Sequence, residues 1–245
     1  MTEGADPLAR ADGRAPEDLR PVEILPGWLS APPGSALIRQ GRTWVLCTAT
    51  LEERVPAWRR GQGRGWLTAS YTMLPAATTE RTERERRGAQ GRTLEIERLI
   101  GRSLRGALDL DRLPEVTLHV DCDVLQADGG TRTVAVTGGW VALASGVRAL
   151  SAAGRLSEAV LVRQVAAVSA GVVDGRALID LDYAEDVRAE TDMNVVMTDQ
   201  GQFLEVQATA EGHPLLGADL TRLLDVTGRG VVELMRHQSV ALCGT

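Results

Sequence analysis

Apolar and polar residues alternate over several short stretches in the first half of the chain, and this period of two predicts β-strands. Residues 36–55 hold two such runs on either side of Gly41, so we expect a hairpin that turns there. The glycine-rich segment 61–74 is expected to be a loop that leads into another strand. A further strand is predicted over 115–127, where the alternation is regular.

Apolar residues at helical spacing appear twice in the same half. Leu99, Ile100 and Leu104 belong to a series that predicts an amphipathic helix from Thr93 to about residue 108. Residues 133–150 are rich in alanine and valine, which predicts a buried helix. A glycine pair within that segment lowers its helix propensity and therefore indicates close packing against a neighbour.

The second half of the chain shows the same kinds of pattern. Strands are expected over 159–175 and 176–186, followed by a hairpin over 191–210 that turns at Asp199–Gly201. The last element is a predicted helix over 217–238, with Asp219 as its expected N-cap.

Hairpins followed by helices, twice over, predict an α+β fold built from two related halves. We expect one domain over residues 1–245, with an N-terminal half at about 10–150 and a C-terminal half at about 155–240. The two halves share no sequence repeat that would prove duplication.

Composition changes this picture little. The chain is 44% hydrophobic and 24% charged, which is typical of soluble globular proteins. No run approaches the roughly 18 apolar residues that span a bilayer, and no secretory signal is visible, so we expect no membrane association and a cytoplasmic location. The three cysteines are widely separated, which fits neither a disulfide framework nor a zinc site.

Charge is more informative. All 27 basic residues are arginine, which excludes mechanisms that need a lysine, such as a Walker-type phosphate loop or a pyridoxal Schiff base. Genomic base bias explains this better than selection for function does, although arginine is suited to bidentate phosphate contact. The net charge of −6 argues against a surface that is basic throughout.

A site for a polyanion must therefore be local, and residues 79–105 are the best location for it. This segment carries eight arginines against five glutamates. A solvated helix face with Glu–Arg pairs explains its first half equally well. The arginines are Arg81, Arg84, Arg86, Arg87, Arg92, Arg98, Arg102 and Arg105.

The stretch DCDVLQADGGTRT (121–133) suggests an anion site. A strand ends, Gly129 and Gly130 permit a tight turn, and a helix is expected to begin at about Thr133. The first amides of a helix lack internal partners and lie at the positive end of its dipole, so phosphate binds there readily. The Thr131 hydroxyl and the Arg132 guanidinium would add to that site. An ordinary strand that ends in a polar turn is the alternative.

Two acidic residues form the second constellation. Asp186 and Asp192 border the start of a predicted strand. Carboxylate oxygens suit Mg²⁺, which keeps several waters and needs only one or two protein ligands besides substrate phosphate. Acids in polar loops are usually just solvated, and that remains the alternative.

A series of motifs stands in order along nearly the whole chain: RADGR (10–14), WVLCTA (44–49), GWLTASYTMLP (65–75), QGRTLEIERLIGRSLR (90–105), VDCDVLQADGGTRT (120–133), VAAVSAGVV (165–173), DLDYAED (180–186), TDMNVVMT (191–198) and EVQATAEG (205–212). Together they resemble the ribonuclease PH family, whose members are bacterial phosphorolytic 3′→5′ exoribonucleases. QADGGTRT and ETDMNVVMT are the most specific of them. The resemblance implies the RNase PH-type α+β fold.

It also implies a reaction, in which inorganic phosphate attacks the last 3′ linkage of RNA and releases a nucleoside 5′-diphosphate. Arg92, together with Gly130, Thr131 and Arg132, would hold the attacking phosphate. Asp186 and Asp192 would hold a divalent metal, Mg²⁺ or Mn²⁺, and one of them is a candidate general acid. The expected catalytic residues are therefore Asp186, Asp192 and Arg132.

The resemblance further implies partners, namely the 3′ ends of RNA, especially tRNA precursors, and identical subunits in a homohexamer built as a trimer of dimers. Arg81, Arg84 and Arg98 are the expected RNA contacts. The chain departs from the family where Ala76 replaces the usual arginine after MLP, in a shortened loop, which puts RNA grip in doubt.

Two other functions stay open at this point. The chain could be a non-catalytic relative that serves as an RNA-binding ring subunit, or a phosphorylase of small molecules. Because Arg132 and both aspartates are present, the active exoribonuclease is favoured.

Overall fold

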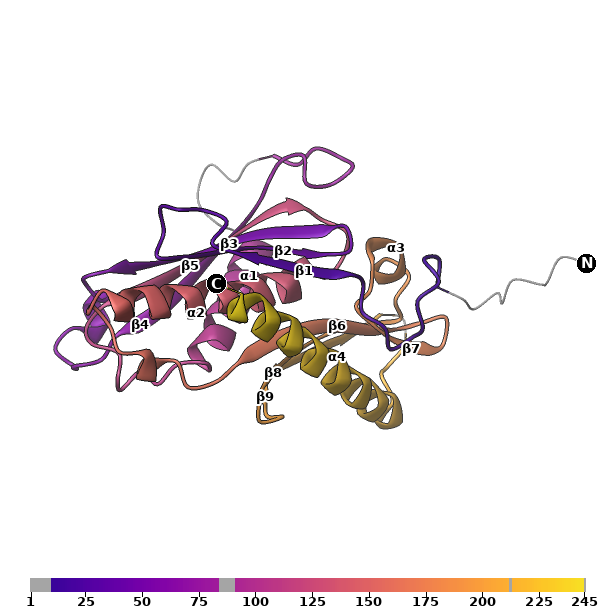
Figure 1. Ribbon diagram of the computed structural model, residues 1–245. Coiled ribbons are helices and arrows are strands. Elements are labelled where there is room, and N and C mark those ends of the chain that lie inside the picture. Colours follow the sequence, from indigo (N-terminus) through magenta and orange to yellow (C-terminus); the bar gives the residue numbers. More distant parts are fainter. Residues whose placement is uncertain (1–9, 84–90, 212, 245) are drawn as a thin grey trace, which may run out of the picture.

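The computed structural model describes residues 10–83, 91–211 and 213–244. Two β-sheets dominate the fold (Figure 1). The first has the order β1-β2-β3-β5-β4, and only β4 and β5 pair in parallel. Its strands are β1 Val22–Pro26, β2 Gly34–Gln40, β3 Thr43–Glu52, β4 Trp66–Met73 and β5 Thr117–Gln126.

The second sheet is antiparallel throughout and has the order β7-β6-β8-β9. Its strands are β6 Val165–Val173, β7 Arg176–Ile179, β8 Thr191–Thr198 and β9 Phe203–Ala210. The helices of the described residues are α1 Arg92–Arg105, α2 Thr131–Ala152, α3 Tyr183–Asp186 and α4 Gly217–Cys243, with 3₁₀ turns at Ala57–Arg59 and Glu158–Val160.

Helix α2 lies between the two sheets and contacts both of them (Figure 1). The predicted close packing at its glycine pair is confirmed, because a Cβ on Gly138 would lie 2.5 Å from Ile38 Cγ2. The buried helix predicted over 133–150 is therefore present. It begins at Thr131, so Thr131 and Arg132 belong to its first turn.

By length and hydropathy α2 alone, among the described helices, could cross a membrane. The helix nevertheless contains no uninterrupted run of 18 apolar residues, because Thr137, Ser145 and Arg148 interrupt it. Most of the helix is buried inside the fold, and this burial accounts for its apolar composition.

Helix α1 packs against β4 and α2 and also contacts β9, whereas α4 packs against β6 and β7. The helix predicted to residue 108 ends at Arg105, where Gly106 forms the C-cap. Helix α4 lies along the second sheet (Figure 1). The predicted N-cap at Asp219 was wrong, because Leu216 precedes the helix and Asp219 lies in its first turn.

The hairpins predicted over 36–55 and 191–210 are confirmed. Strand β1 was not expected. The strand predicted over 159–175 is confined to β6.

The strand predicted over 176–186 was wrong beyond Ile179. Asp180 takes a left-handed backbone conformation with φ of 51°, which ends the strand. Asp182 and Glu185 then form a reciprocal capping box that starts α3. The predicted α+β class is confirmed, while the division into two related halves stays a prediction.

Candidate active site

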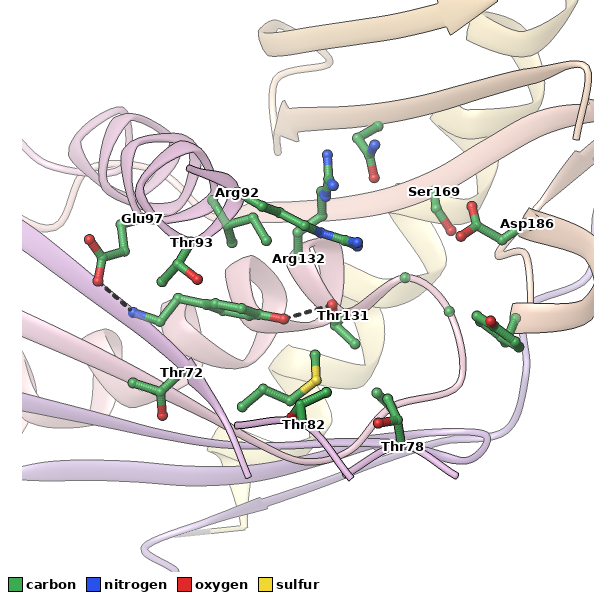
Figure 2. Close-up of a pocket in the computed structure, with 18 of the residues that line it drawn as sticks. Thr72, Thr78, Thr82, Arg92, Thr93, Glu97, Thr131, Arg132, Ser169 and Asp186 are labelled. Carbon is green, nitrogen blue, oxygen red and sulfur yellow. Dashed lines mark hydrogen bonds between the residues drawn. The ribbon is translucent and has the colours of Figure 1, made fainter. Parts of the chain in front are cut away.

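The two predicted constellations meet in one cavity. Its volume is about 790 Å³, and it lies among the end of β4, the start of α1, the loop before α2, and the segment from α3 to β8 (Figure 2). The predicted residues that line it are Arg92, Gly130, Thr131, Arg132, Asp186 and Asp192.

A glycine brings these segments together. Gly129 has a φ of 78°, and a Cβ there would lie 2.5 Å from the Leu181 carbonyl oxygen and 2.9 Å from the Tyr183 nitrogen. Only a residue without a side chain allows so close an approach. The phosphate loop, which we define as residues 128–132, therefore lies directly against the segment that leads into α3 and Asp186.

Helix α2 presents its N-terminus to the cavity. Its N-cap is Gly130, with φ of 64°, and no described side chain caps it. The Tyr71 hydroxyl donates a 2.8 Å hydrogen bond to Thr131 Oγ1, drawn dashed in Figure 2. Burial raises the pKa of Tyr71, so its phenol remains a donor. Because Thr131 accepts this bond, its own proton is free for an anion.

Two guanidinium groups enter the same space. Arg92 is the first residue of α1, and Arg132 is the second residue of α2 (Figure 2). The Arg132 side chain is only 16% exposed, and its Nη1 lies 3.7 Å from Glu95 Oε1. Two helix N-termini and two guanidinium groups together favour a bound anion.

The carboxylates of Asp186 and Asp192 line the same cavity. Burial raises the pKa of Asp186, although Arg92 and Arg132 act to lower it. Burial also raises the pKa of Asp192, and the charge of Asp186 adds to that effect. Two carboxylates that repel each other in a half-buried site are suited to share a divalent cation.

No cluster of three or more His, Cys, Asp or Glu side chains suited to a metal occurs in the described part of the chain. A pair of carboxylates still fits Mg²⁺, because this ion usually keeps waters and takes oxygens from substrate phosphate.

The described residues among the predicted RNA contacts lie outside the cavity. Arg98 is exposed on α1, and Arg81 is exposed in the segment after β4; neither lines the cavity. Arg84 lies outside the described residues. Thr78 and Thr82, from the same segment as Arg81, do line the cavity (Figure 2).

Sequence reasoning missed several polar residues of the cavity. Ser169 and Asn194 are buried, face each other across β6 and β8, and line it, as Tyr71 does. A polar residue within an otherwise apolar strand was the available signal for the first two. Nothing in the local sequence singles out Tyr71.

Comparisons with known proteins agree with this geometry. Models of the 3′ exoribonuclease family match residues 18–147 (domain 1) and 163–230 (domain 2). Ribonuclease PH of Corynebacterium efficiens is 53% identical over 237 residues, which cover 96% of this chain and 97% of that one. Ribonuclease PH of Mycolicibacterium smegmatis is 54% identical over 236 residues, which cover 95% and 91%.

The chain belongs to the ribonuclease PH family of 3′ exoribonucleases. Solved structures agree in fold. An Archaeoglobus fulgidus exosome with RNA bound to the active site gives a TM-score of 0.79 at 21% identity, with 94% of this chain and 92% of that chain covered. Rice Rrp46 gives 0.77 at 20% identity, with 95% and 100% covered.

The predicted RNase PH fold is thereby confirmed. The expected activity is confirmed as well: this member of the ribonuclease PH family is a phosphate-dependent 3′→5′ exoribonuclease that acts on RNA.

Proposed function

We propose that the N-terminus of α2 binds the attacking orthophosphate. The observation that carries this proposal is the convergence of Arg92, Thr131, Arg132, Asp186 and Asp192 on one cavity. The free amides of α2, the proton of Thr131 and the two guanidinium groups are all donors, which matches the acceptor oxygens of phosphate.

In the proposed reaction, an oxygen of the bound phosphate attacks the last phosphodiester phosphorus, and a P–O–P linkage forms. The bond from that phosphorus to O3′ breaks, and O3′ gains a proton. The products are a nucleoside 5′-diphosphate and an RNA that is one residue shorter. Phosphoryl transfer of this kind needs positioning and electrostatic stabilisation rather than a covalent enzyme intermediate.

The two aspartates donate the proton and bind the metal, whereas the arginines bind the phosphate. We assign the proton for O3′ to Asp186 or Asp192, because burial raises the pKa of both. The same pair would hold a divalent cation, Mg²⁺ or Mn²⁺, which would neutralise charge on the scissile phosphate. Arg92 and Arg132 keep the attacking phosphate in place.

RNA would approach along exposed arginines outside the cavity. Arg81 and Arg98 are exposed, and with Arg84 they supply local positive charge in a chain that is negative overall. We propose tRNA precursors as substrates. We also propose that identical subunits form a homohexamer arranged as a trimer of dimers.

The test is to incubate a short labelled RNA with Mg²⁺, with and without orthophosphate. The proposal expects nucleoside diphosphates that appear only with phosphate, and a turnover that a chelator abolishes. Turnover that persists in the chelator would contradict the proposed metal, and an unchanged phosphate KM in Arg132→Ala would contradict the proposed phosphate site. The mass of the assembly in solution tests the homohexamer.

A further inference from the structure

The segment before β1 carries three largely buried arginines that do not line the cavity. Arg10 and Arg14 belong to the motif RADGR, and Arg20 precedes β1. This segment runs past β7 and α3 (Figure 1). Burial of a guanidinium is costly unless its charge and its donors find partners. The partners of Arg20 are therefore informative about its role.

The ionic partner of Arg20 is Asp180, which follows β7. Arg20 Nη2 donates to Asp180 Oδ1 at 2.6 Å, and Nε donates to Oδ2 at 3.1 Å. The exposed fractions of the two side chains are 4% and 1%. Burial acts to raise the pKa of Asp180, but the charge and hydrogen bonds of Arg20 outweigh it and hold that pKa below its ordinary value. The pair is therefore ionic.

The same guanidinium also reaches the phosphate loop, and its Nη1 lies 3.4 Å from Thr43 Oγ1. Nη1 donates to the Asp128 carbonyl oxygen, and Nη2 lies 3.4 Å from the Gly129 carbonyl oxygen. Thr43, which is fully buried, adds two bonds to the same loop. Its Oγ1 accepts from the Asp128 nitrogen at 3.0 Å and donates to the Gly129 carbonyl oxygen at 2.7 Å.

We name Arg20, Thr43 and Asp180 the loop clamp. In a trans peptide the N–H points away from the carbonyl of the preceding residue. When the clamp fixes the Gly129 carbonyl, it therefore turns the Gly130 N–H to the opposite side. Gly129 and Gly130 both have positive φ. Glycine adopts positive and negative φ about equally readily, so the two residues do not by themselves fix this conformation. Without the clamp, the loop would populate several backbone conformations.

We propose that the loop clamp is a positioning device that sets the phosphate loop in its binding conformation against the segment before α3. None of its three residues lines the cavity. The proposal rests on phosphate binding at α2, as proposed above. It predicts that substitutions in the clamp raise the KM for orthophosphate more than they change kcat or the KM for RNA.

A second buried pair in the same segment supplies a matched control. Arg10 makes a bidentate contact with Glu185, at 2.8 and 2.7 Å, and donates to the carbonyl oxygens of Ile179 and Asp180 at 3.0 Å. This pair is as buried as the clamp, but it holds α3 and has no hydrogen bond to residues 128–130 among the described contacts.

The main experiment uses Thr43→Val and Thr43→Ser. Valine has nearly the shape of threonine but loses both bonds to the loop, whereas serine keeps the hydroxyl. For Thr43→Val we expect the KM for orthophosphate to rise about tenfold, because loss of loop placement costs binding. The kcat at saturating phosphate and the KM for RNA should stay within about threefold. Thr43→Ser should restore the phosphate KM to the wild-type range.

The companion experiment uses Arg20→Lys and Arg10→Lys. A lysine at position 20 can still pair with Asp180, but it lacks the fork that also reaches the loop. We expect Arg20→Lys to raise the phosphate KM at least about tenfold and Arg10→Lys to leave it within about twofold. Circular dichroism shows whether each variant folds, and if Arg20→Lys does not, the Thr43 pair decides.

Two results would overturn the loop clamp. One is a folded Thr43→Val variant with the wild-type phosphate KM. The other is an equal rise in Arg10→Lys and Arg20→Lys, which would mean that the effect does not depend on the hydrogen bonds of Arg20 to residues 128–129. Failure of the proposed phosphate site at α2 is recognised separately, because Arg132→Ala would then keep the wild-type KM for orthophosphate.

Discussion

The inner end of the cavity and its outer surroundings are built differently. At the inner end, Thr131 is held by Tyr71, and Arg132 is largely buried beside Glu95. Outside the cavity, Arg81 and Arg98 are exposed to solvent. One region fixes its donors before any ligand arrives, and the other presents mobile charge on long side chains.

This difference determines what each region can contribute. Donors fixed in a site that excludes water stabilise developing charge without reorganisation during the reaction. Exposed cations attract RNA from a distance, but salt screens them and each contributes little. Substitutions at the inner end should therefore change turnover or phosphate binding strongly, whereas those outside should change RNA affinity weakly.

The largest effect is expected for Asp192→Asn. The variant keeps the shape of the side chain but removes one of the two carboxylates proposed to share the cation, so kcat should fall on the order of a thousandfold. Turnover is measured over a range of Mg²⁺ concentrations. RNA binding should persist, and an asparagine variant of near-normal rate would place the metal elsewhere.

Arg132→Ala should come next. Loss of a buried guanidinium from the phosphate site should lower kcat/KM for phosphate on the order of a hundredfold, since charged hydrogen bonds are the strong ones. Arg132→Lys keeps the charge but lacks the two-pronged guanidinium. Its kcat/KM for phosphate should therefore lie between those of Arg132→Ala and the wild type. Wild-type kinetics at low phosphate in the alanine variant would contradict the inner end as the phosphate site.

Much of this inner end could be predicted from the sequence, for a local reason. In QADGGTRT a strand end, two glycines and a helix start are consecutive, so the sequence itself specifies the turn that exposes the α2 amides. The hairpins were predictable for the same reason, because a period of two and a glycine turn are local signals.

The rest depends on contacts between distant segments. Tyr71 reaches Thr131 only because β4 pairs in parallel with β5, and no local pattern indicates that pairing. The strand expected through residue 186 failed because Asp180 takes a left-handed conformation while its carboxylate pairs with Arg20. In both cases a tertiary contact outweighs local propensity.

Tyr71→Phe tests whether a fixed donor matters even where no charge is involved. The ring stays, but Thr131 loses the bond that orients its hydroxyl, so the phosphate KM should rise about two- to tenfold. Tyr183→Phe is the control, because Tyr183 also lines the cavity but is 62% exposed. Equal effects of the two changes would mean that the orientation of Thr131 has no part in binding.

The smallest effect is expected for Arg98→Ala. Loss of one exposed phosphate contact should weaken RNA binding by no more than about fivefold and lower the slope of log affinity against log salt by about one.

Arg102→Ala is its control on the same helix. Arg102 is already paired with Glu205, at 2.8 Å between Nη2 and Oε1, so its removal should change RNA affinity and salt slope less. The phosphate KM should stay constant in both variants. A rise in the phosphate KM of Arg98→Ala would place Arg98 with the inner end, and the distinction between fixed and mobile arginines would no longer hold.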